Sequence, residues 1–518
     1  MKKITLQNIV FPHQEDDTKA LYYRLCDFAG NPLAAVWQGE KRQDEEGISL
    51  KKGSILSTDT YFNLFDVAAW HKYTGLSNWK LALQLQGECV LRFYRWDDKK
   101  TLLSKQEIKA AEKTTIEMDF SWVEQDRMFF FEIEAQDDMI FYQGEYLAKI
   151  LPEKINPVHL SLLICTYRRE QELSTIQAML KKSHFFNHQS NSPASKGCVG
   201  GELNLSTQTA SYYGGMSVRI IDNASELPEI DEPYITLYHN PNTGGSGGFT
   251  RGLLESRRDE TEYGITHIIF MDDDVKVNME TFYRLYALLS LVKPCYQEAV
   301  VGGRMFRLNK PYIQYTAAEI WNKGDVKHIG YEQDMREGKA LREMNQKLGE
   351  YSGWWFACFP MSFAKTETPL PFFLHCDDVE YGLRHGGKPI LLNGIQVWHD
   401  TYENRNSPLM SYYDCRNTMI VNTLYGQYQD EKELLKKWIL QMIYAFRAKK
   451  YDALYPFLLA LKDYLKGKDY FMSCRTKKEI KGPKLPLAKG AVVILAAIQL
   501  PCFFLKVKRA FRSYEDKA

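Results

Sequence analysis

Four short apolar runs between residues 158 and 274 constrain the fold of this chain more than any other feature. The runs lie in "VHLSLLICTYRRE", "SVRIIDNAS", "YITLYHN" and "THIIFMDDD", and the helical pattern "QELSTIQAMLKK" follows the first of them. Runs of this length, apolar on both faces, are typical of strands buried in a parallel sheet, whose crossover connections contain helices. Their order therefore predicts an open α/β sheet.

The segments on either side of this sheet carry different patterns. Residues 1–155 alternate β-rich runs with polar turns, which predicts an antiparallel β-sandwich; the runs are "DTYFNLFDVAAW", "NWKLALQLQGECVLRFYRW", "TTIEMDFSW" and "RMFFFEIEAQ". Beyond Tyr425, "KELLKKWILQMIYAFRAKK" and "LYPFLLALKDYL" place apolar residues three and four positions apart, which predicts helices. A chain of 518 residues is too long for one core, so we expect domains at residues 1–155, 156–425 and 426–518.

Charge is distributed unevenly along the chain. The whole chain carries +1, but from Asp430 onward 20 Lys and Arg stand against 9 Asp and Glu, so this tail carries +11 and the remainder −10. Such asymmetry indicates an anionic partner for the tail, and we favour membrane lipid over nucleic acid. The apolar run "AVVILAAIQLPCFFL" at residues 491–505 is shorter than the roughly 20 residues that span a bilayer, but it can lie in the interface. A buried helix of the last domain is the alternative.

The N-terminus and the cysteines indicate the compartment. The first residues, "MKKITLQNIVFPHQ", lack the sustained apolar stretch and the cleavage site of a secretory signal, so we expect a cytoplasmic protein. The ten cysteines form no Cys-x-x-Cys pair, which favours free thiols over disulfides or a zinc site.

The stretch "NPNTGGSGGFTRG" at residues 240–252 places four glycines in five positions. It follows an apolar strand and precedes a helical pattern, which is the setting of a phosphate-binding turn, because small residues let a ligand approach backbone N–H groups. Thr250 stands where a GxGxxG pattern from Gly245 needs glycine, and no Gly-Lys-Ser/Thr follows, so neither a Rossmann fingerprint nor a P-loop is supported. A flexible turn without a ligand is the alternative.

Three consecutive aspartates end the last of the four apolar runs. In an extended segment Asp272 and Asp274 point to the same side while Asp273 points away, so the first and third can share a divalent ion. The buried strand that leads into them indicates a cleft at the carboxyl ends of the strands. An acidic cluster that is merely solvated is the alternative.

Further along, "LPFFLHCDDVEYGLRHGGKPILLNGIQVWHD" supplies Asp377, Asp378 and His399, residue types suited to a catalytic base and a metal ligand. Taken alone, a histidine such as His399 is more often a satisfied core histidine. In "YSGWWFACFP", Trp354 or Trp355 can stack on a sugar face, or both can be core aromatics.

Together and in this order, several segments resemble the polymerising galactofuranosyltransferases of glycosyltransferase family 2: "CTYRRE", "IDNAS", "NPNTGGSGGFTRG", "FMDDDV", "SGWWF", "CDDVEYGLR" and "VWHD". The likeness covers about residues 55 to 420, including "TYFNLF". It implies an α/β fold: a GT-A nucleotide-sugar domain with an N-terminal antiparallel β-sandwich and C-terminal helices. It also implies an inverting transfer of galactofuranose from UDP-galactofuranose to a hydroxyl of a growing cell-surface glycan.

The resemblance assigns a role to eleven residues. Asp378 is expected to be the general base, and Asp377, Glu319 and Trp355 are expected to line the acceptor side. Mn²⁺ or Mg²⁺ is expected on Asp272, Asp274 and His399. The nucleotide sugar is expected to contact Arg169, Asp222, Asn242 and Asp273.

Two segments depart from the family pattern: the polar, Gly- and Ser-rich insertion at residues 187–215, predicted to be a long loop, and "SYYDCRN" beyond His399. A family 2 transferase of another sugar, such as rhamnose, and a noncatalytic carbohydrate-binding protein remain as alternative functions. We expect as partners a UDP-sugar, a glycan or lipid-linked glycan, and the anionic inner face of the cell membrane, with no nucleic acid. A homo-oligomer is left open.

Overall fold

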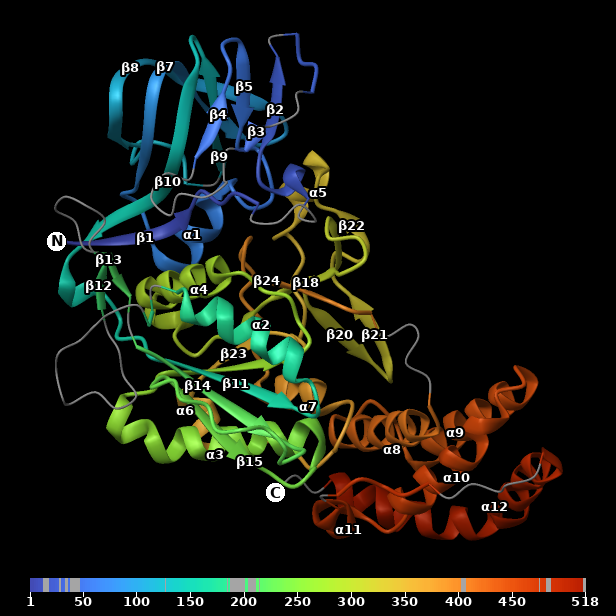
Figure 1. The fold of residues 1–518 in the computed structure, drawn as a ribbon. Helices are drawn as coiled ribbons and strands as arrows, with labels where there is room; N and C mark the ends of the chain where they lie inside the picture. Colours follow the sequence, from blue (N-terminus) through green and yellow to red (C-terminus); the bar gives the residue numbers. More distant parts are fainter. Residues whose placement is uncertain are drawn as a thin grey trace.

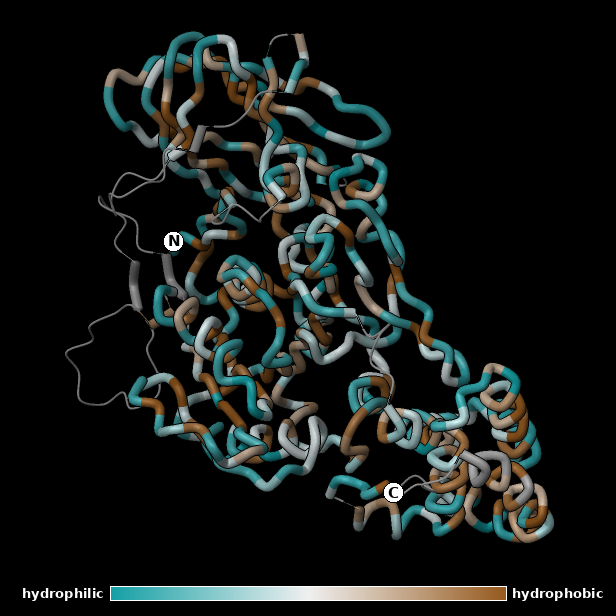
Figure 2. The backbone as a smooth tube through the Cα atoms, turned by 45° about the vertical axis from the view of Figure 1, so that its right-hand side comes forward, coloured by the Kyte–Doolittle hydropathy of each residue, from teal (hydrophilic) through white to brown (hydrophobic). Residues whose placement is uncertain are grey.

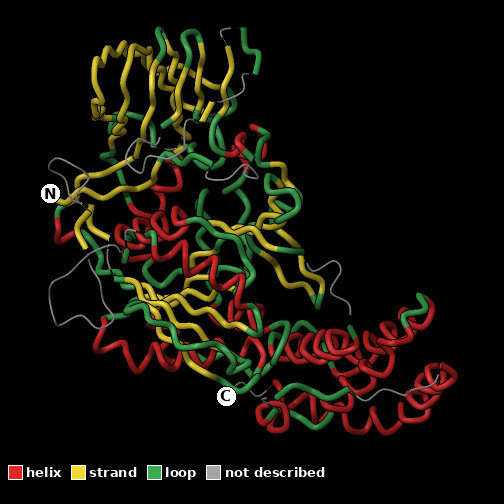
Figure 3. Tube along the Cα trace, viewed as in Figure 1, coloured by secondary structure: helices red, strands yellow, loops and turns green. Residues whose placement is uncertain are grey.

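The computed structural model describes residues 1–12, 18–27, 29–32, 36–37, 47–125, 127–183, 185–186, 201–203, 211–213, 215–401, 407–474, 476–480 and 486–515. A β-sheet domain, a mixed α/β domain and a group of helices follow one another along the chain (Figure 1). The C-terminal helices form a separate lobe beside the mixed domain (Figure 3). The predicted combination of an antiparallel sheet, an α/β domain and C-terminal helices is confirmed, whereas the exact domain bounds stay predictions.

The N-terminal part is built on one hydrogen-bonded sheet. Within the described residues it has 12 strands, and its longest path runs β12-β13-β1-β10-β7-β9-β5-β2. The strands are β1 (Lys2–Asn8), β2 (Arg24–Asp27), β3 (Val36–Trp37), β4 (Ile48–Leu50), β5 (Ser54–Ser57), β6 (Phe65–Asp66), β7 (Lys80–Trp96), β8 (Lys100–Asp119), β9 (Met128–Ala135), β10 (Met139–Ile150), β12 (Gly201–Leu203) and β13 (Ser211–Tyr213).

Strand β7 explains why these strands form a single sheet. Its first half pairs with β10 and its second half with β9, and the register shifts at Gly87, whose φ is +118°. A bulge of this kind bends a strand and lets it take part in two halves of a folded sheet. The antiparallel pairing is as predicted, but the two separate sheets of a sandwich are not confirmed.

The predictions for two segments of the N-terminal sheet, one of them in the insertion at residues 187–215, are corrected. In "DTYFNLFDVAAW" the last residues begin a helix, α1 (Val67–Thr74), because the Asp66 carboxylate accepts a hydrogen bond of 2.9 Å from the Ala69 N–H. The insertion at residues 187–215 is not only a loop, because its strands β12 and β13 extend the sheet beyond β1. Residues 187–200, 204–210 and 214 of the insertion lie outside the described residues, as does Cys198.

The predicted parallel sheet is confirmed in the second part. The strand order is β15-β14-β11-β16-β23-β17, with the first four parallel and the last two antiparallel to their neighbours. Helix α3 packs against β11 and β14 on one face, and α2 and α4 lie toward the N-terminal sheet (Figure 1). The elements are β11 (Leu160–Thr166), α2 (Glu170–Lys181), β14 (Met216–Asp222), β15 (Ile235–His239), α3 (Gly244–Tyr263), β16 (His267–Asp272), α4 (Met279–Leu291), β17 (Val301–Gly302), β23 (Ala357–Pro360), α6 (Met361–Thr366) and α7 (Asp377–His385).

A smaller sheet and a hairpin complete this part. The small sheet has the order β22-β19-β18-β24, and β20 pairs with β21. Their bounds are β18 (Arg304–Arg307), β19 (Ile313–Thr316), β20 (Glu319–Asn322), β21 (Asp325–His328), β22 (Gln333–Asp334) and β24 (Gln396–His399), with α5 (Gly338–Glu343) beside them. Single 3-10 turns lie at Lys19–Leu21, Pro152–Lys154 and Pro294–Tyr296.

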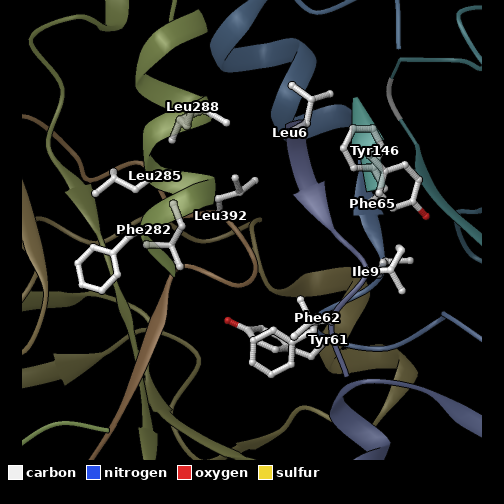
Figure 4. Close-up of a cluster of buried hydrophobic side chains, with 14 of the residues drawn as sticks. Leu6, Ile9, Tyr61, Phe62, Phe65, Tyr146, Phe282, Leu285, Leu288 and Leu392 are labelled. Atoms are coloured by element: carbon white, nitrogen blue, oxygen red, sulfur yellow. The ribbon is translucent and has the colours of Figure 1, made fainter. Parts of the chain in front are cut away.

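The N-terminal sheet and the α/β domain share one hydrophobic core. Side chains of α4 face those of β1 and of the "TYFNLF" segment, and Ile9, Tyr146 of β10 and Leu392 belong to the same cluster. The labelled residues are Leu6, Ile9, Tyr61, Phe62, Phe65, Tyr146, Phe282, Leu285, Leu288 and Leu392 (Figure 4). The buried Arg284 guanidinium donates to the Phe62 carbonyl at 2.7 Å and pairs with Glu280 at 2.6 Å. The two parts are therefore packed as one unit.

The C-terminal helices form a second hydrophobic core together with residues of the α/β domain, among them Tyr351, Phe372, Phe373, Cys376 and Val379. The helices are α8 (Pro408–Leu424), α9 (Glu431–Arg447), α10 (Tyr451–Tyr464), α11 (Lys468–Ser473) and α12 (Pro486–Glu515). Apolar stretches run along them (Figure 2). Among the described helices, α12 has the length and composition that would allow it to cross a membrane: within Ala491–Glu515 an 18-residue window has a mean hydropathy of 1.9, a criterion that buried helices of soluble proteins also meet. The described cysteines are free.

Candidate functional site

The carboxyl ends of the parallel strands open onto a cavity of about 1230 Å³. Strand ends at one edge of an open α/β sheet are the usual place for a ligand. Nine of the eleven predicted site residues line this cavity; the exceptions are Asp222 and His399. The cavity extends from the sheet edge to the β20–β21 hairpin and to helices α8 and α9.

Asp272, Asp274 and His399 form a group whose ligand atoms all lie within 4.8 Å of one another. His399 Nε2 lies 2.9 Å from an Asp274 oxygen and 3.8 Å from an Asp272 oxygen. His399 reaches this position because β24 runs parallel to β18, and it is almost fully buried. Two carboxylates and one imidazole suit Mn²⁺ or Mg²⁺, so these residues fit the predicted metal site.

Arg169 pairs with two aspartates of the acidic run 272–274. Its guanidinium lies 3.1 Å from an Asp273 oxygen and also pairs with Asp274. Burial alone would raise the pKa of Asp274, but His399 and Arg169 hold that pKa well below its usual range. Burial raises the pKa of Asp272 to about 7 despite the attraction of His399. The cluster therefore contains one firmly ionised carboxylate and one that protonates readily.

The glycine stretch is the start of a helix rather than a loop. Helix α3 begins at Gly244, and a Cβ there would lie 2.0 Å from the Phe373 carbonyl oxygen. A Cβ on Gly248 would lie 2.2 Å from Cys165 Sγ, whereas one on Gly245 would meet only Asp377 Oδ2, at 3.6 Å. Gly244 and Gly248 therefore permit close packing, whereas Gly245 lies on the open side, and the approach of a ligand to this helix start stays a prediction.

Asp222 and Asn242 differ in how they relate to the cavity. Asn242 lines it, and its side-chain oxygen accepts a hydrogen bond of 3.1 Å from the Gly244 N–H. Asp222 is buried at the end of β14 and accepts backbone hydrogen bonds from the residues of the following turn, Ala224, Glu226 and Leu227. Asp222 therefore orders that turn, and its predicted contact with UDP stays a prediction.

Asp377 and Asp378 are the first two residues of α7 and face the cavity. Burial, the neighbouring Asp377 and Glu319 raise the pKa of Asp378 well above its usual range. Burial also raises the pKa of Asp377, to about 6, although its own backbone N–H and His375 favour the ionised form. Two adjacent carboxyls that resist joint ionisation are typical of a site that takes up a proton.

Glu319 approaches this pair from β20. It exchanges backbone hydrogen bonds with Tyr351, and a bridge of 2.9 Å joins its carboxylate to His328. Tyr351 comes close to α7 because Gly382 has no side chain; a Cβ there would lie 2.5 Å from the Tyr351 Cβ. Burial contributes most to raising the pKa of the Tyr351 hydroxyl, and the negative charges of Glu319 and Asp378 raise it further. Tyr351 is a site residue that the sequence did not reveal.

The two tryptophans are largely buried, although both contact the cavity. Trp354 stacks on Phe270, with ring centroids 4.6 Å apart, inside a small aromatic core. The Trp355 Nε1–H donates to the Gly303 carbonyl at 2.7 Å. Core packing is therefore shown for both, and the acceptor contact of Trp355 stays a prediction.

Several residues that line the far side of the cavity were not predicted. They come from the β20–β21 hairpin and from the C-terminal helices, and include Trp321, Lys323, Asp325, His375, Asp414, Lys437 and Trp438. His375 adjoins the predicted pair in "HCDD", which was the only local signal. Tertiary packing brings the other residues to the cavity, and no short sequence motif predicts this.

Comparisons with known proteins agree with the resemblance. Residues 6–149 match the family model described as galactofuranosyltransferase 2 N-terminal. The chain is 24% identical over 398 residues to galactofuranosyltransferase GlfT2 of Mycolicibacterium smegmatis, covering 72% of this chain and 58% of that protein. The chain resembles galactofuranosyltransferases.

GlfT2 of Mycobacterium tuberculosis is 24% identical over 288 residues, covering 52% of this chain and 44% of that protein. The galactofuranosyltransferase-like chain thus spans about half the length of the curated relatives it matches. Among solved structures, a mannosyltransferase from Pyrobaculum calidifontis in complex with GDP-Man and Mn²⁺ aligns with a TM-score of 0.30 at 11% identity, over 71% of this chain and 88% of that chain. A TM-score this low carries no argument about function.

Proposed function

We propose that the chain is an inverting, metal-dependent glycosyltransferase of family 2 with a GT-A domain. In this proposal it moves galactofuranose from UDP-galactofuranose to a hydroxyl of a growing cell-surface glycan. The observation that carries it is one cavity lined by two separate acidic sets, the metal-type group around Asp274 and the carboxylate pair of α7. The similarity to galactofuranosyltransferases supports the choice of sugar.

The two acidic sets divide the chemistry. Asp378 takes the proton of the acceptor hydroxyl as its oxygen attacks the anomeric carbon, and the bond from that carbon to the diphosphate oxygen breaks. A single displacement of this kind inverts the configuration. Asp272, Asp274 and His399 would hold Mn²⁺ or Mg²⁺, which when bound supplies positive charge that stabilises the leaving diphosphate.

The remaining residues bind and orient the substrates. Arg169, Asn242 and Asp273 contact the nucleotide sugar, and the open face of Gly245 lets it approach the start of α3. Asp222 orders the turn beneath the nucleotide. Beside Asp378, the acceptor is lined by Asp377, Glu319 and Trp355.

Transfer assays with a panel of UDP- and dTDP-sugars test the proposal. We expect transfer from UDP-galactofuranose to a galactofuranosyl acceptor, with loss of activity in Asp378→Asn. Transfer of rhamnose or another sugar instead would keep the enzyme class and change the donor. Binding of glycan without hydrolysis or transfer of any donor would refute the enzyme and favour a carbohydrate-binding protein.

We also propose that the C-terminal helices dock on the anionic inner face of the cell membrane. Buried residues of α12 pack in the helical core, but large apolar side chains of α9 and α12 remain exposed: Leu440, Ile443, Tyr444, Phe446, Leu495, Ile498, Phe504 and Leu505. Exposed Arg447 ends α9, and exposed Lys449 and Lys450 follow the helix directly. Apolar side chains among basic ones are typical of peripheral binding to anionic lipid.

A further inference from the structure

The peptide that leads into the carboxylate pair is strained. Phe373, His375 and Cys376 have φ values of 72°, 62° and 65°, in the left-handed region that residues other than glycine rarely adopt. Three such residues in four positions cost free energy and persist only where surrounding contacts hold them. Because α7 begins at Asp377, the direction of this peptide determines where both carboxylates point.

Helix α8 supplies those contacts through one continuous segment. The Asn417 side-chain amide donates to the carbonyls of Leu374 at 2.7 Å and His375 at 2.9 Å. The Arg416 guanidinium donates to the Phe372 carbonyl at 2.9 Å and, through Nε, to the Asn417 side-chain oxygen at 2.8 Å. Both side chains are at least nine-tenths buried.

Two neighbours on α8 hold side chains of the same peptide. Tyr413 stacks on Phe373, with ring centroids 5.2 Å apart and an interplanar angle of 16°. The Asp414 carboxylate lies 2.9 Å from His375 Nδ1. These contacts come from "SYYDCRN", residues 411–417, the segment that departs from the family pattern.

The opposite side of the strained peptide rests on the start of α3. The Phe373 N–H donates to Ser246 Oγ at 2.9 Å, and its carbonyl fills the space that a side chain at Gly244 would need. The peptide is thus held between α8 and the glycine-rich helix start. The two supporting segments, residues 413–417 of α8 and residues 244–246 of α3, come from different parts of the chain.

We infer that Asn417, oriented by Arg416, is a positioning residue that fixes Asp377 and Asp378 through the peptide 372–376. The inference rests on the proposed function, since it assigns those carboxylates to transfer. It makes the C-terminal helices part of the machinery that sets the turnover rate, in addition to any role at a membrane. Loss of the two amide donors leaves the half-buried carbonyls of Leu374 and His375 without these hydrogen bonds, so the strained peptide relaxes and the carboxylates move.

The chain offers a matched control. The side-chain amide of Asn393 is also fully buried and donates to two backbone carbonyls, those of Tyr61 at 3.0 Å and Leu64 at 2.8 Å. These carbonyls belong to the interface with the N-terminal sheet and not to the cavity. Asn393→Asp therefore removes the same kind of amide-to-carbonyl hydrogen bonds at a place away from the cavity. We expect only the stability of the fold to change there.

The experiment compares Asn417→Asp, Asn417→Ser and Asn393→Asp in the full chain. We expect Asn417→Asp to lower kcat about 100-fold, since a shift of about 1 Å in a reacting group costs that much. Its KM for the donor and its affinity for UDP in Mn²⁺ should stay within threefold of wild type. Amide hydrogens of residues 373–378 should exchange faster. Asn417→Ser, which keeps one donor, should lie between, and Asn393→Asp should lower Tm while leaving kcat within threefold.

The inference is overturned if Asn417→Asp keeps kcat within threefold of wild type, or if Asn393→Asp loses as much. If Asn417→Asp does not fold, the kcat of Asn417→Ser is compared with that of wild type and of Asn393→Asp instead. If the wild type transfers no sugar, the proposed function fails separately. Amide exchange of residues 373–378 then decides alone, and unchanged exchange in the Asn417 variants refutes the positioning role.

Discussion

Gly248 and Gly245, both at the start of α3, allow the effect of close packing on stability to be measured separately from the approach of a ligand. Gly248→Ala gains about 1 kcal/mol of helix propensity, but its Cβ would lie 2.2 Å from Cys165 Sγ. Atoms in contact normally stay about 3.5 Å or more apart, and overpacking costs about 1–3 kcal/mol. The overlap of more than about 1 Å puts the cost at the upper end of that range, so after the gain in propensity we expect Gly248→Ala to lower the free energy of unfolding by about 1–2 kcal/mol.

A double-mutant cycle with Cys165→Ala isolates the contact. Without the sulfur, the nearest atoms to the new methyl are Asn223 Nδ2 at 3.1 Å and Cys165 Cβ at 3.3 Å, which small shifts can accommodate. Gly248→Ala should then be neutral or stabilising, with a coupling energy of roughly 1–3 kcal/mol. Urea unfolding measures all four chains. A Gly248→Ala protein as stable as wild type, or no coupling to Cys165, would refute the reasoning.

Gly245→Ala is the matched counterpart on the open side. Its Cβ meets only Asp377 Oδ2 at 3.6 Å, an ordinary contact, so stability should hold or rise. The methyl would stand where the nucleotide sugar approaches, and a steric cost of about 1–3 kcal/mol corresponds to a roughly 5- to 150-fold rise in the dissociation constant. Calorimetric titration with UDP and Mn²⁺ measures it. Binding equal to wild type would mean that the ligand does not approach this helix start.

Four further outcomes test the site and the tail. Asp378→Asn should lower turnover about 100- to 10,000-fold with UDP affinity unchanged, measured by radiolabelled transfer; near-normal transfer would remove it as the base. Because burial and Asp377 raise the pKa of Asp378, kcat/KM should rise with pH as the pair loses its proton. Asp377→Asn removes a negative neighbour and should move that limb to lower pH; an unmoved limb contradicts the coupling. EDTA should abolish activity, Mn²⁺ or Mg²⁺ should restore it, and Asp274→Ala should weaken metal-dependent UDP binding; full activity in chelator would exclude the metal. Ile498→Glu with Leu505→Glu should release the protein from anionic liposomes at low salt, and equal sedimentation would refute docking by α12.

The elements predicted correctly from the sequence are those whose pattern lies within one short segment. The runs ending at Thr166, Asp222, His239 and Asp272 became neighbouring parallel strands, because residues apolar on both faces have few alternatives to a covered sheet. Asp272 ends β16 and Asp274 lies in the turn that follows, so strand alternation does not explain why they lie together; their grouping with His399 is what the family resemblance implied.

What the sequence missed depends on contacts between distant segments. The glycines were interpreted as a ligand loop because nothing nearby shows that Phe373 and Cys165 pack against them. Tyr351 entered the site through the missing side chain of Gly382, which is 31 positions away. The folded single sheet escaped prediction because a bulge at Gly87, and not a turn, redirects β7.

The shared core of Figure 4 determines when the chain can complete its fold during synthesis. The N-terminal sheet ends at Ile150, apart from the strands of the insertion, but α4, which covers Leu6 and Phe62, begins at Met279. At roughly 5–20 residues per second, the ribosome needs about 6 to 26 seconds to make the intervening segment. During that interval the nascent sheet presents an uncovered apolar face to the cell, so chaperone binding should be strongest between the emergence of β10 and that of α4.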